Sequence, residues 1–235
     1  MKTIFKIHPF FYLFAIICIL TGYFKNFLFI TCIIIFHELG HILTAYILNW
    51  KIEKVVLLPF GGITIFNEYI NRPIKEEFLI AIMGPIFQSF LFFINNDLFR
   101  EYNFNLLLFN LLPIFPLDGS KIINLFLNKI IDFKQSHLIS IVISIMSILF
   151  LFHYKYSLIL YISILFLIIK TIKELKLHKY LYNKFLFERY LYKFKFKKTK
   201  IINNKNNMMR DYNHIIREKN KYIKEYDFLL KLFDN

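Results

Sequence analysis

The chain has 235 residues, a net charge of +14 and 57% hydrophobic residues, and 30 of its residues are Phe. This length allows one membrane domain with a small appendage and excludes two large globular domains. So much apolar surface also excludes an ordinary soluble domain, because its core would be too small to bury it; lipid is therefore the expected solvent for much of the chain.

Six apolar stretches along the chain predict six transmembrane helices. They cover about residues 7–24, 26–50, 78–96, 102–128, 136–154 and 156–169. The predicted fold class is therefore an all-α polytopic membrane protein, to which a short membrane-associated β-hairpin and a helical cytoplasmic tail are added. The fifth and sixth stretches follow each other closely and are expected to form a tight helical hairpin.

Basic residues between the apolar stretches predict the orientation of the chain. With a cytoplasmic N-terminus, the inside segments carry eight Lys and Arg and the outside loops carry three. The inside residues are Lys2, Lys6, Lys51, Lys54, Arg72, Lys75, Lys129 and Lys134, and the outside residues are Lys25, Arg100 and Lys155. Because cytoplasmic loops carry an excess of Lys and Arg, both termini are expected in the cytoplasm of a bacterial cell.

The segment 52–66, between the second and third stretches, has a different pattern. Two runs rich in Val, Ile, Leu and Phe flank the turn residues Pro59-Phe60-Gly61-Gly62, which predicts a β-hairpin. Such a hairpin can enter the membrane only where protein satisfies its backbone groups. An extended edge strand at this place could hold a substrate by strand addition.

The C-terminal part of the chain is strongly basic, with 18 of the 30 Lys and Arg from Lys170 onward. We expect a basic amphipathic helix along the anionic membrane surface, then a break, then one charged helix over 208–233. Nucleic-acid binding is the alternative, but the tail has no recognised nucleic-acid motif. Three regions result: a six-span membrane domain (1–172), a membrane-surface linker (173–200) and a short helical tail (201–235).

The sequence His37-Glu38-Leu39-Gly40-His41 lies inside the second apolar stretch. On a helix, His37 and His41 are one turn apart and share a face, so both imidazoles can reach one zinc ion. Glu38 beside them can accept a proton from a water molecule that the metal activates. The alternative is that these side chains only bond to neighbouring helices, but ionisable groups inside a membrane span indicate a functional site.

A zinc site of this kind needs a third protein ligand, and Asp118 is the strongest candidate. It lies in Asn110-Leu-Leu-Pro-Ile-Phe-Pro116-Leu-Asp118-Gly119, in the middle of the fourth apolar stretch, where two prolines predict a broken helix. Glu53, Glu68, Glu76 and Glu77 are alternatives, but all lie in the polar loop. Asp118 could also be only the cap of a half-helix.

These paired motifs resemble the site-2 protease family of intramembrane metalloproteases. The resemblance covers roughly residues 5–195 and is strongest to the sporulation branch of that family. It implies that His37, His41 and Asp118 bind zinc and that Glu38 is the catalytic base. It also implies that Asn110 contacts the substrate backbone or the oxyanion, and that Pro116, Phe60 and Gly61 belong to substrate-binding elements.

One further segment matches the family pattern, and the C-terminal end departs from it. Ala81-Ile82-Met83-Gly84-Pro85 matches a Gly-Pro element that packs on the catalytic helix, with Gln88 near the place of a family Asn. The sporulation proteases usually carry a nucleotide-responsive CBS domain, and the 35 residues after Lys200 are too few for a complete one.

The function expected from the sequence is that of a zinc metalloendopeptidase. By resemblance, its substrate is a membrane-associated sporulation pro-sigma factor, with inhibitory membrane partners, in the membrane that surrounds the forespore. The alternatives are a protease acting on another membrane client such as an anti-sigma factor, a non-proteolytic scaffold that binds client helices, and a zinc or proton transporter.

Overall fold

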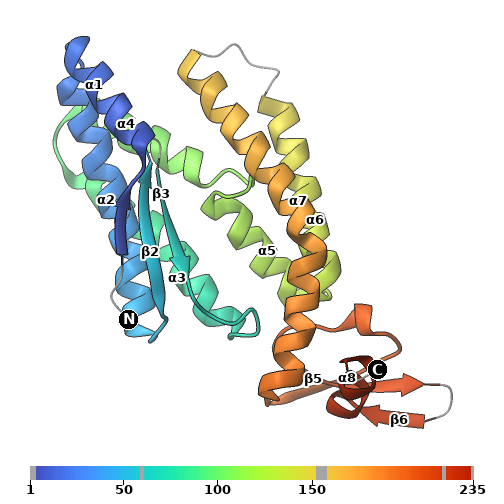
Figure 1. Cartoon of the computed structure of the whole chain (residues 1–235). Helices are drawn as coiled ribbons and strands as arrows, with labels where there is room; N and C mark the ends of the chain where they lie inside the picture. Colours follow the sequence, from blue (N-terminus) through green and yellow to red (C-terminus); the bar gives the residue numbers. More distant parts are fainter. Residues whose placement is uncertain (1–3, 59–60, 152–157, 219–220, 234–235) are drawn as a thin grey trace. The chain divides into compact units, whose positions relative to one another are not determined.

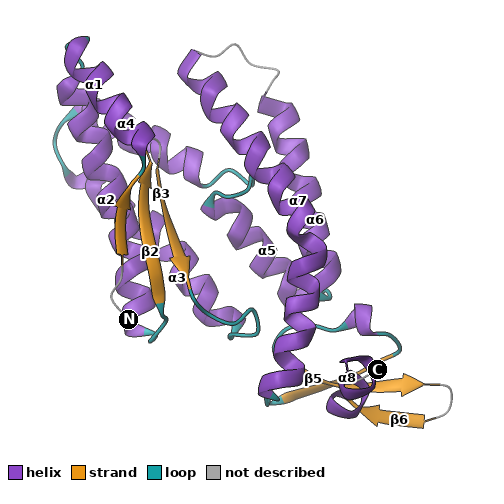
Figure 2. Cartoon of the chain, in the orientation of Figure 1, coloured by secondary structure: helices purple, strands orange, loops and turns teal. Residues whose placement is uncertain are grey.

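The computed structural model describes residues 4–58, 61–151, 158–218 and 221–233. It is mostly helical, with two small three-stranded sheets (Figures 1 and 2). The chain divides into two compact units that are described separately. The first comprises Met1–Glu68, Phe78–Leu112 and Leu117–Gly119, and the second comprises Tyr69–Glu77, Pro113–Pro116 and Ser120–Asn235.

The helices of the first unit follow most of the expected apolar stretches. They are α1 (Pro9–Leu20), α2 (Phe24–Ile47), α3 (Ile74–Ser89), which continues into the 3-10 turn η1 (Phe90–Phe93), and α4 (Asp97–Asn110). Across the described residues, three helical segments are long and apolar enough to cross a membrane, namely Phe24–Ile47, Ile74–Phe93 and Phe133–Leu151. The 12 residues of α1 form a shorter apolar helix, because the strand β1 takes the residues before Pro9.

The predicted β-hairpin is confirmed in the first unit. Its strands β2 (Ile52–Leu58) and β3 (Gly61–Phe66) are antiparallel, and the turn at 59–60 lies outside the described residues. A strand that was not predicted, β1 (Ile4–Ile7), pairs in parallel with β2, so the order is β1-β2-β3 and β3 is an edge (Figure 2). The four residues of β1 carry too little pattern to be separated from the apolar stretch that follows.

Two clusters of buried side chains fix α2 within the first unit. Before the His-Glu-x-x-His sequence, Ile33 packs with Leu91 of η1 and Phe99 of α4. Near its end, Ala45 packs with Trp50 and with Ile80 of α3. The helix is therefore fixed on both sides of the His-Glu-x-x-His sequence that it carries.

The fourth apolar stretch is broken, as its prolines predicted. Helix α4 ends at Asn110 and α5 (Asp118–Ile130) begins at Asp118. The intervening turn contains Pro113 and the cis peptide bond Phe115–Pro116. Gly119 permits this turn, because a side chain there would collide with the carbonyl groups of Leu111 and Leu112. The break therefore leaves Asp118 at the first position of a new helix.

In the second unit, α5 is followed by α6 (Phe133–Leu151) and by α7 (Leu158–Tyr192), a single helix of 35 residues. The expected boundary between a membrane domain and a linker at 172/173 falls inside α7, so no break in secondary structure marks it. The sequence changes there from apolar to basic. Such a change shows where the surroundings of a helix change, and not where the helix ends. The linker helix ends at Tyr192 rather than near Lys200.

The prediction of one charged helix over 208–233 is wrong. This region contains strands β5 (Tyr212–Glu218) and β6 (Lys221–Lys224), and only α8 (Glu225–Phe233) is helical. Strand β4 (Lys198–Ile202) lies parallel to β5 after the expected linker helix, and the 3-10 turn η2 (Lys205–Asn207) follows it. Alternating burial explains the strand: His214 and Ile216 of β5 are buried, and this period of two is hidden in sequence by the many charged residues.

The core of this C-terminal part is continuous with the end of α7. Phe185 of α7 is fully buried with Ile202, Met208, Ile216 and Leu229. The aromatic ring of Phe133, at the start of α6, stacks on Phe185 with 4.5 Å between ring centroids. The small sheet and α8 are therefore packed onto the helices of the second unit rather than forming a free tail.

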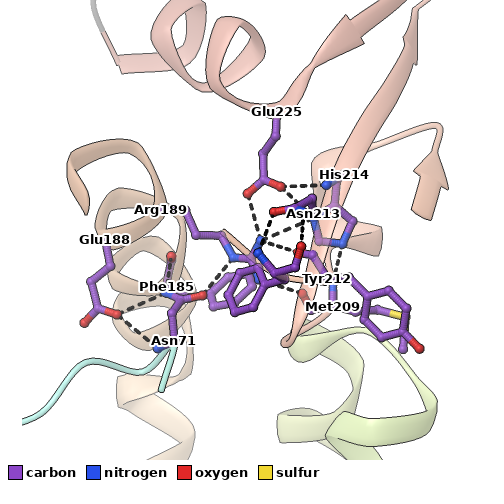
Figure 3. Close-up of polar contacts among 10 residues, drawn as sticks. Asn71, Phe185, Glu188, Arg189, Met209, Tyr212, Asn213, His214 and Glu225 are labelled. Carbon is purple, nitrogen blue, oxygen red and sulfur yellow. Dashed lines mark hydrogen bonds and ion pairs between the residues drawn. The ribbon is translucent and has the colours of Figure 1, made fainter. Parts of the chain in front are cut away.

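A buried guanidinium, that of Arg189 on α7, is at the centre of this packing (Figure 3). It donates hydrogen bonds to the carbonyl groups of Met209 and Tyr212, at 2.8 and 2.9 Å, and to Asn71 Oδ1 at 2.7 Å. It also forms a 2.8 Å ion pair with Glu225 at the start of α8. One side chain thus joins α7, the loop before α3, and both ends of the C-terminal sheet segment.

Candidate active site

Three side chains that the sequence singled out as metal ligands lie together in the first unit. His37 and His41 are buried on α2, with their Nε2 atoms 3.1 Å apart. Asp118, the first residue of α5, places Oδ2 2.9 Å from Nε2 of His37 and 3.2 Å from Nε2 of His41. One ligand atom from each residue lies within 4.8 Å of the others, so these three residues can hold a metal ion.

In both imidazoles, a hydrogen bond at Nδ1 orients the ring toward a possible metal position. His41 Nδ1 lies 2.7 Å from the carbonyl oxygen of Ile80, which can only accept, so Nδ1 carries a proton. His37 Nδ1 lies 2.9 Å from Gln88 Oε1. The amide orientation of Gln88 follows from its Nε2, which donates to the carbonyl oxygen of Asn103 at 3.0 Å. Each imidazole thus has an acceptor for its Nδ1 proton, so Nε2, the nitrogen beside Asp118 Oδ2, is the one that would bind a metal.

The space around the two imidazoles depends on glycines of α2 and α3. A side chain at Gly84 would collide with the ring of His41 and would lie 2.9 Å from His37 Nε2. A side chain at Gly40 would collide with the backbone of Met83. The two helices therefore approach each other closely, and the backbone of Gly84 lies directly against the ring nitrogens.

The donor set fits zinc. Two neutral imidazoles and one carboxylate, with a fourth position free, form the three-ligand set typical of catalytic zinc sites. Each imidazole is oriented by an acceptor on its other nitrogen, as metal-binding histidines almost always are. The convergence of His37, His41 and Asp118 would leave a carboxylate between two imidazoles, an arrangement that a cation stabilises directly.

Glu38 is buried beside the two histidines, and only 5% of it is exposed. Its Oε2 accepts a 2.7 Å hydrogen bond from the hydroxyl group of Thr64 on β3. A side chain at Gly62 would collide with the carboxylate of Glu38. The Glu38 carboxylate thus lies directly against the backbone of the hairpin strand.

The expected substrate-binding residues have different outcomes. Asn110 is the last residue of α4, and a methyl group added at Gly61 would lie 4.0 Å from its Oδ1, so these two residues are close. Pro116 lies in the turn before α5, after the cis peptide bond. Phe60 lies outside the described residues.

Sequence reasoning gave no role to Gln88, Asn103 or Thr64. Gln88 and Asn103 are fully buried, and each is a polar residue within or beside an apolar stretch. That pattern could have identified Gln88, since buried polar groups need partners. Thr64 carries no such signal, because Thr is common in strands.

Comparisons with known proteins identify a peptidase family. The family model described as peptidase family M50 matches residues 25–96 and 97–153. The chain is 35% identical over 202 residues to stage IV sporulation protein FB of Bacillus subtilis, covering 78% of this chain and 70% of that protein. It is 34% identical over 119 residues to a zinc metalloprotease of Methanocaldococcus jannaschii, covering 44% of this chain and 34% of that protein.

A solved structure shares the fold. The site-2 protease from Methanocaldococcus jannaschii superposes with a TM-score of 0.50 at 26% identity, and the match covers 79% of this chain and 93% of that one. Together with the three apolar helices, these relatives indicate a membrane protein. The chain therefore belongs to peptidase family M50, the site-2 protease family, whose members depend on zinc.

Proposed function

We propose that this protein is an intramembrane zinc metalloendopeptidase that cleaves membrane-associated proteins, with Glu38 as its catalytic base. The observation that carries the proposal is the convergence of His37, His41 and Asp118 on one point, with Glu38 on the same helix. A scaffold that only bound client helices would not need this ligand set, whose imidazoles are both oriented through their second nitrogens.

In the proposed mechanism, His37, His41 and Asp118 hold the metal. Zinc, when bound there, supplies the activation of a water molecule and the polarisation of the scissile carbonyl group. Glu38 accepts the proton that the attacking water loses and then donates it to the leaving amine. Its place directly after His37 on α2 and its burial support this role.

Substrate binding is assigned to the hairpin and to the end of α4. Asn110, as an amide, can donate a hydrogen bond to the substrate backbone or to the developing oxyanion. The closeness of its Oδ1 to Gly61 supports a shared role with Pro59-Phe60-Gly61-Gly62. The free edge of β3 can pair with an extended substrate segment, and Pro116 shapes the turn that leads to Asp118.

We assign the chain six membrane spans, with both termini in the cytoplasm and a membrane domain over 1–172. The three long apolar helices and the Lys and Arg bias of the loops support this layout. The shorter α1, the broken pair α4 and α5, and the apolar start of α7 would supply the other spans. The basic residues after Lys170 would then face anionic headgroups.

The proposed substrate is a membrane-associated pro-sigma factor of sporulation, cleaved in the membrane that surrounds the forespore. The identity to stage IV sporulation protein FB supports this assignment. An anti-sigma factor or another membrane client is the alternative substrate for the same chemistry.

Co-expression with a tethered pro-sigma factor tests the proposal. Glu38→Gln should retain zinc and lose cleavage, whereas Glu53→Gln, at an exposed site on β2, should leave both unchanged. Cleavage by Glu38→Gln at the wild-type rate would refute the mechanism. Stoichiometric zinc without cleavage of any client would support a scaffold, and zinc flux across vesicles would support a transporter.

A further inference from the structure

Strand β3 presents one face to helix α2. Side chains alternate along a strand, so Gly62, Thr64 and Phe66 share a face. Phe66, at one end, packs edge-on against Trp50 with 5.6 Å between ring centroids, in the cluster that includes Ala45 of α2. Gly62, at the other end, lies against Glu38. This face of the strand is therefore fixed against α2 on both sides of Thr64.

The register of the hairpin strengthens this placement. Thr64 pairs with the buried residue Val55 in the middle of β2, with Gly62 opposite Leu57 and Phe66 opposite Ile52. The threonine thus occupies a central ladder position and not the turn. A β-branched side chain at such a position has restricted rotation, so its hydroxyl group is held in one direction.

That hydroxyl group donates a 2.7 Å hydrogen bond to Oε2 of Glu38. A glutamate side chain has three rotatable bonds, and a catalytic base must be held within hydrogen-bond reach of the proton that it accepts. The bond to Oε2 restricts the rotation of the carboxylate and leaves Oε1 as the oxygen that can accept a proton. The absence of a side chain at Gly62 lets the carboxylate approach the strand closely enough for this bond.

We propose that Thr64 is a positioning residue for catalysis, which acts by holding the Glu38 carboxylate in its reactive orientation. The inference rests on the proposed role of Glu38 as the base. It also makes the hairpin part of the chemical step, because the strand whose edge can receive a substrate is the strand that orients the base. Any displacement of β3 would then change the catalytic rate as well as substrate affinity.

The test compares Thr64→Val with Thr64→Ser in the purified full chain, with a tethered substrate. Val keeps the branched shape and removes the hydroxyl group, whereas Ser keeps the hydroxyl group. Since misplacing a reacting group by about 1 Å can cost roughly 100-fold, Thr64→Val should lower kcat by about 10- to 100-fold. KM and bound zinc should stay within about twofold of wild type, and Thr64→Ser should retain most of kcat.

Several results would overturn the proposal. A wild-type kcat in Thr64→Val, or a raised KM with unchanged kcat, would mean that Thr64 does not position the base. If Thr64→Val loses zinc, Thr64→Ala, which has a smaller side chain, is measured instead, and the same loss of kcat is expected. Loss of zinc from both variants would make Thr64 a purely structural residue.

Glu38→Gln, measured beside these variants, separates this inference from the proposed function. An inactive Glu38→Gln together with a fully active Thr64→Val would refute only the positioning role of Thr64. An active Glu38→Gln would remove the catalytic base itself, and with it the proposed mechanism.

Discussion

Gln88 and His37 are joined by a 2.9 Å hydrogen bond that determines which nitrogen of the imidazole faces Asp118. The amide of Gln88 is itself fixed by Asn103, whose carbonyl oxygen accepts from Nε2. A residue on α4 therefore helps to select the tautomer of a histidine on α2, through a fully buried side chain on α3.

Replacing Gln88 should weaken metal binding without touching a ligand. Gln88→Met keeps the length of the side chain and removes the acceptor for His37 Nδ1. The loss of such an orienting partner typically costs about 10- to 100-fold in metal affinity, and we expect a loss in that range. Competition with a chromophoric chelator measures it. Gln88→Glu, which keeps an acceptor oxygen, should bind zinc more tightly than Gln88→Met; equal wild-type affinity in both would contradict the role.

Asp118→Asn should lose both zinc and cleavage. The amide keeps the size of the side chain but removes the negative charge that lies between two imidazoles. Asp132→Asn is the matched control, since Asp132 accepts from Gln135 N at the start of α6, as an asparagine also can. Metal analysis and a cleavage assay check both variants. A chelator should abolish wild-type cleavage, and added zinc should restore it; cleavage that survives chelation would refute a metal-dependent reaction.

Arg189→Met should loosen the C-terminal sheet. It leaves Glu225 partly buried without its cationic partner and removes the donor to the carbonyl groups of Met209 and Tyr212. Breaking one partner of a buried ion pair costs about 3–5 kcal/mol. Hydrogen exchange of the β5 amides in the full chain reports this loss. Arg217→Met, at an exposed position of β5, should change the same amides by less than about 0.5 kcal/mol. Similar protection in both variants would argue against the Arg189 network.

Acidification should destabilise the same sheet. Burial alone would raise the pKa of Glu225, but the hydrogen bond from His214 and the charge of Arg189 outweigh it and hold this pKa below its ordinary value. Burial lowers the pKa of His214, by more than its hydrogen bond to Glu225 raises it. Both shifts mean that the unfolded chain binds protons more readily than the folded one.

The pH window follows from these two directions. Stability due to neutral His214 declines as pH falls below about 6.5, and stability due to ionised Glu225 declines as pH falls below about 4.3. Protection factors of the β4, β5 and β6 amides should therefore decrease from pH 7 to pH 4 relative to amides of α6. A constant ratio over this range would show that neither group is linked to the stability of the sheet.

The sequence predicted the parts of the site that have a local pattern. The pair His37 and His41 shares a helix face through its spacing alone, and the break before Asp118 follows from two prolines. The hairpin over 52–66 was marked by its turn residues. In contrast, the bonds from Gln88 to His37 and from Thr64 to Glu38 join elements that are distant in sequence, and no local pattern encodes which polar side chain meets which.

The C-terminal part was mispredicted because its composition conceals its periodicity. Arg217, Glu218 and Lys221 give β5 and β6 the appearance of a solvated helix, while the burial of His214 and Ile216 depends on Phe185 of α7. In the sequence, Arg189 resembles the other basic residues of a surface helix. Only tertiary packing distinguishes this guanidinium from the exposed basic residues around it.

The continuity of α7 has a mechanical consequence. A helix of 35 residues is about 50 Å long, whereas the hydrocarbon layer of a bilayer is about 30 Å thick. In the proposed six-span arrangement, where the apolar start of α7 crosses the bilayer, a helix of this length would carry its basic end beyond the lipid tails. The Arg189 network at that end would then be held at a fixed distance from the apolar layer by the continuous helix.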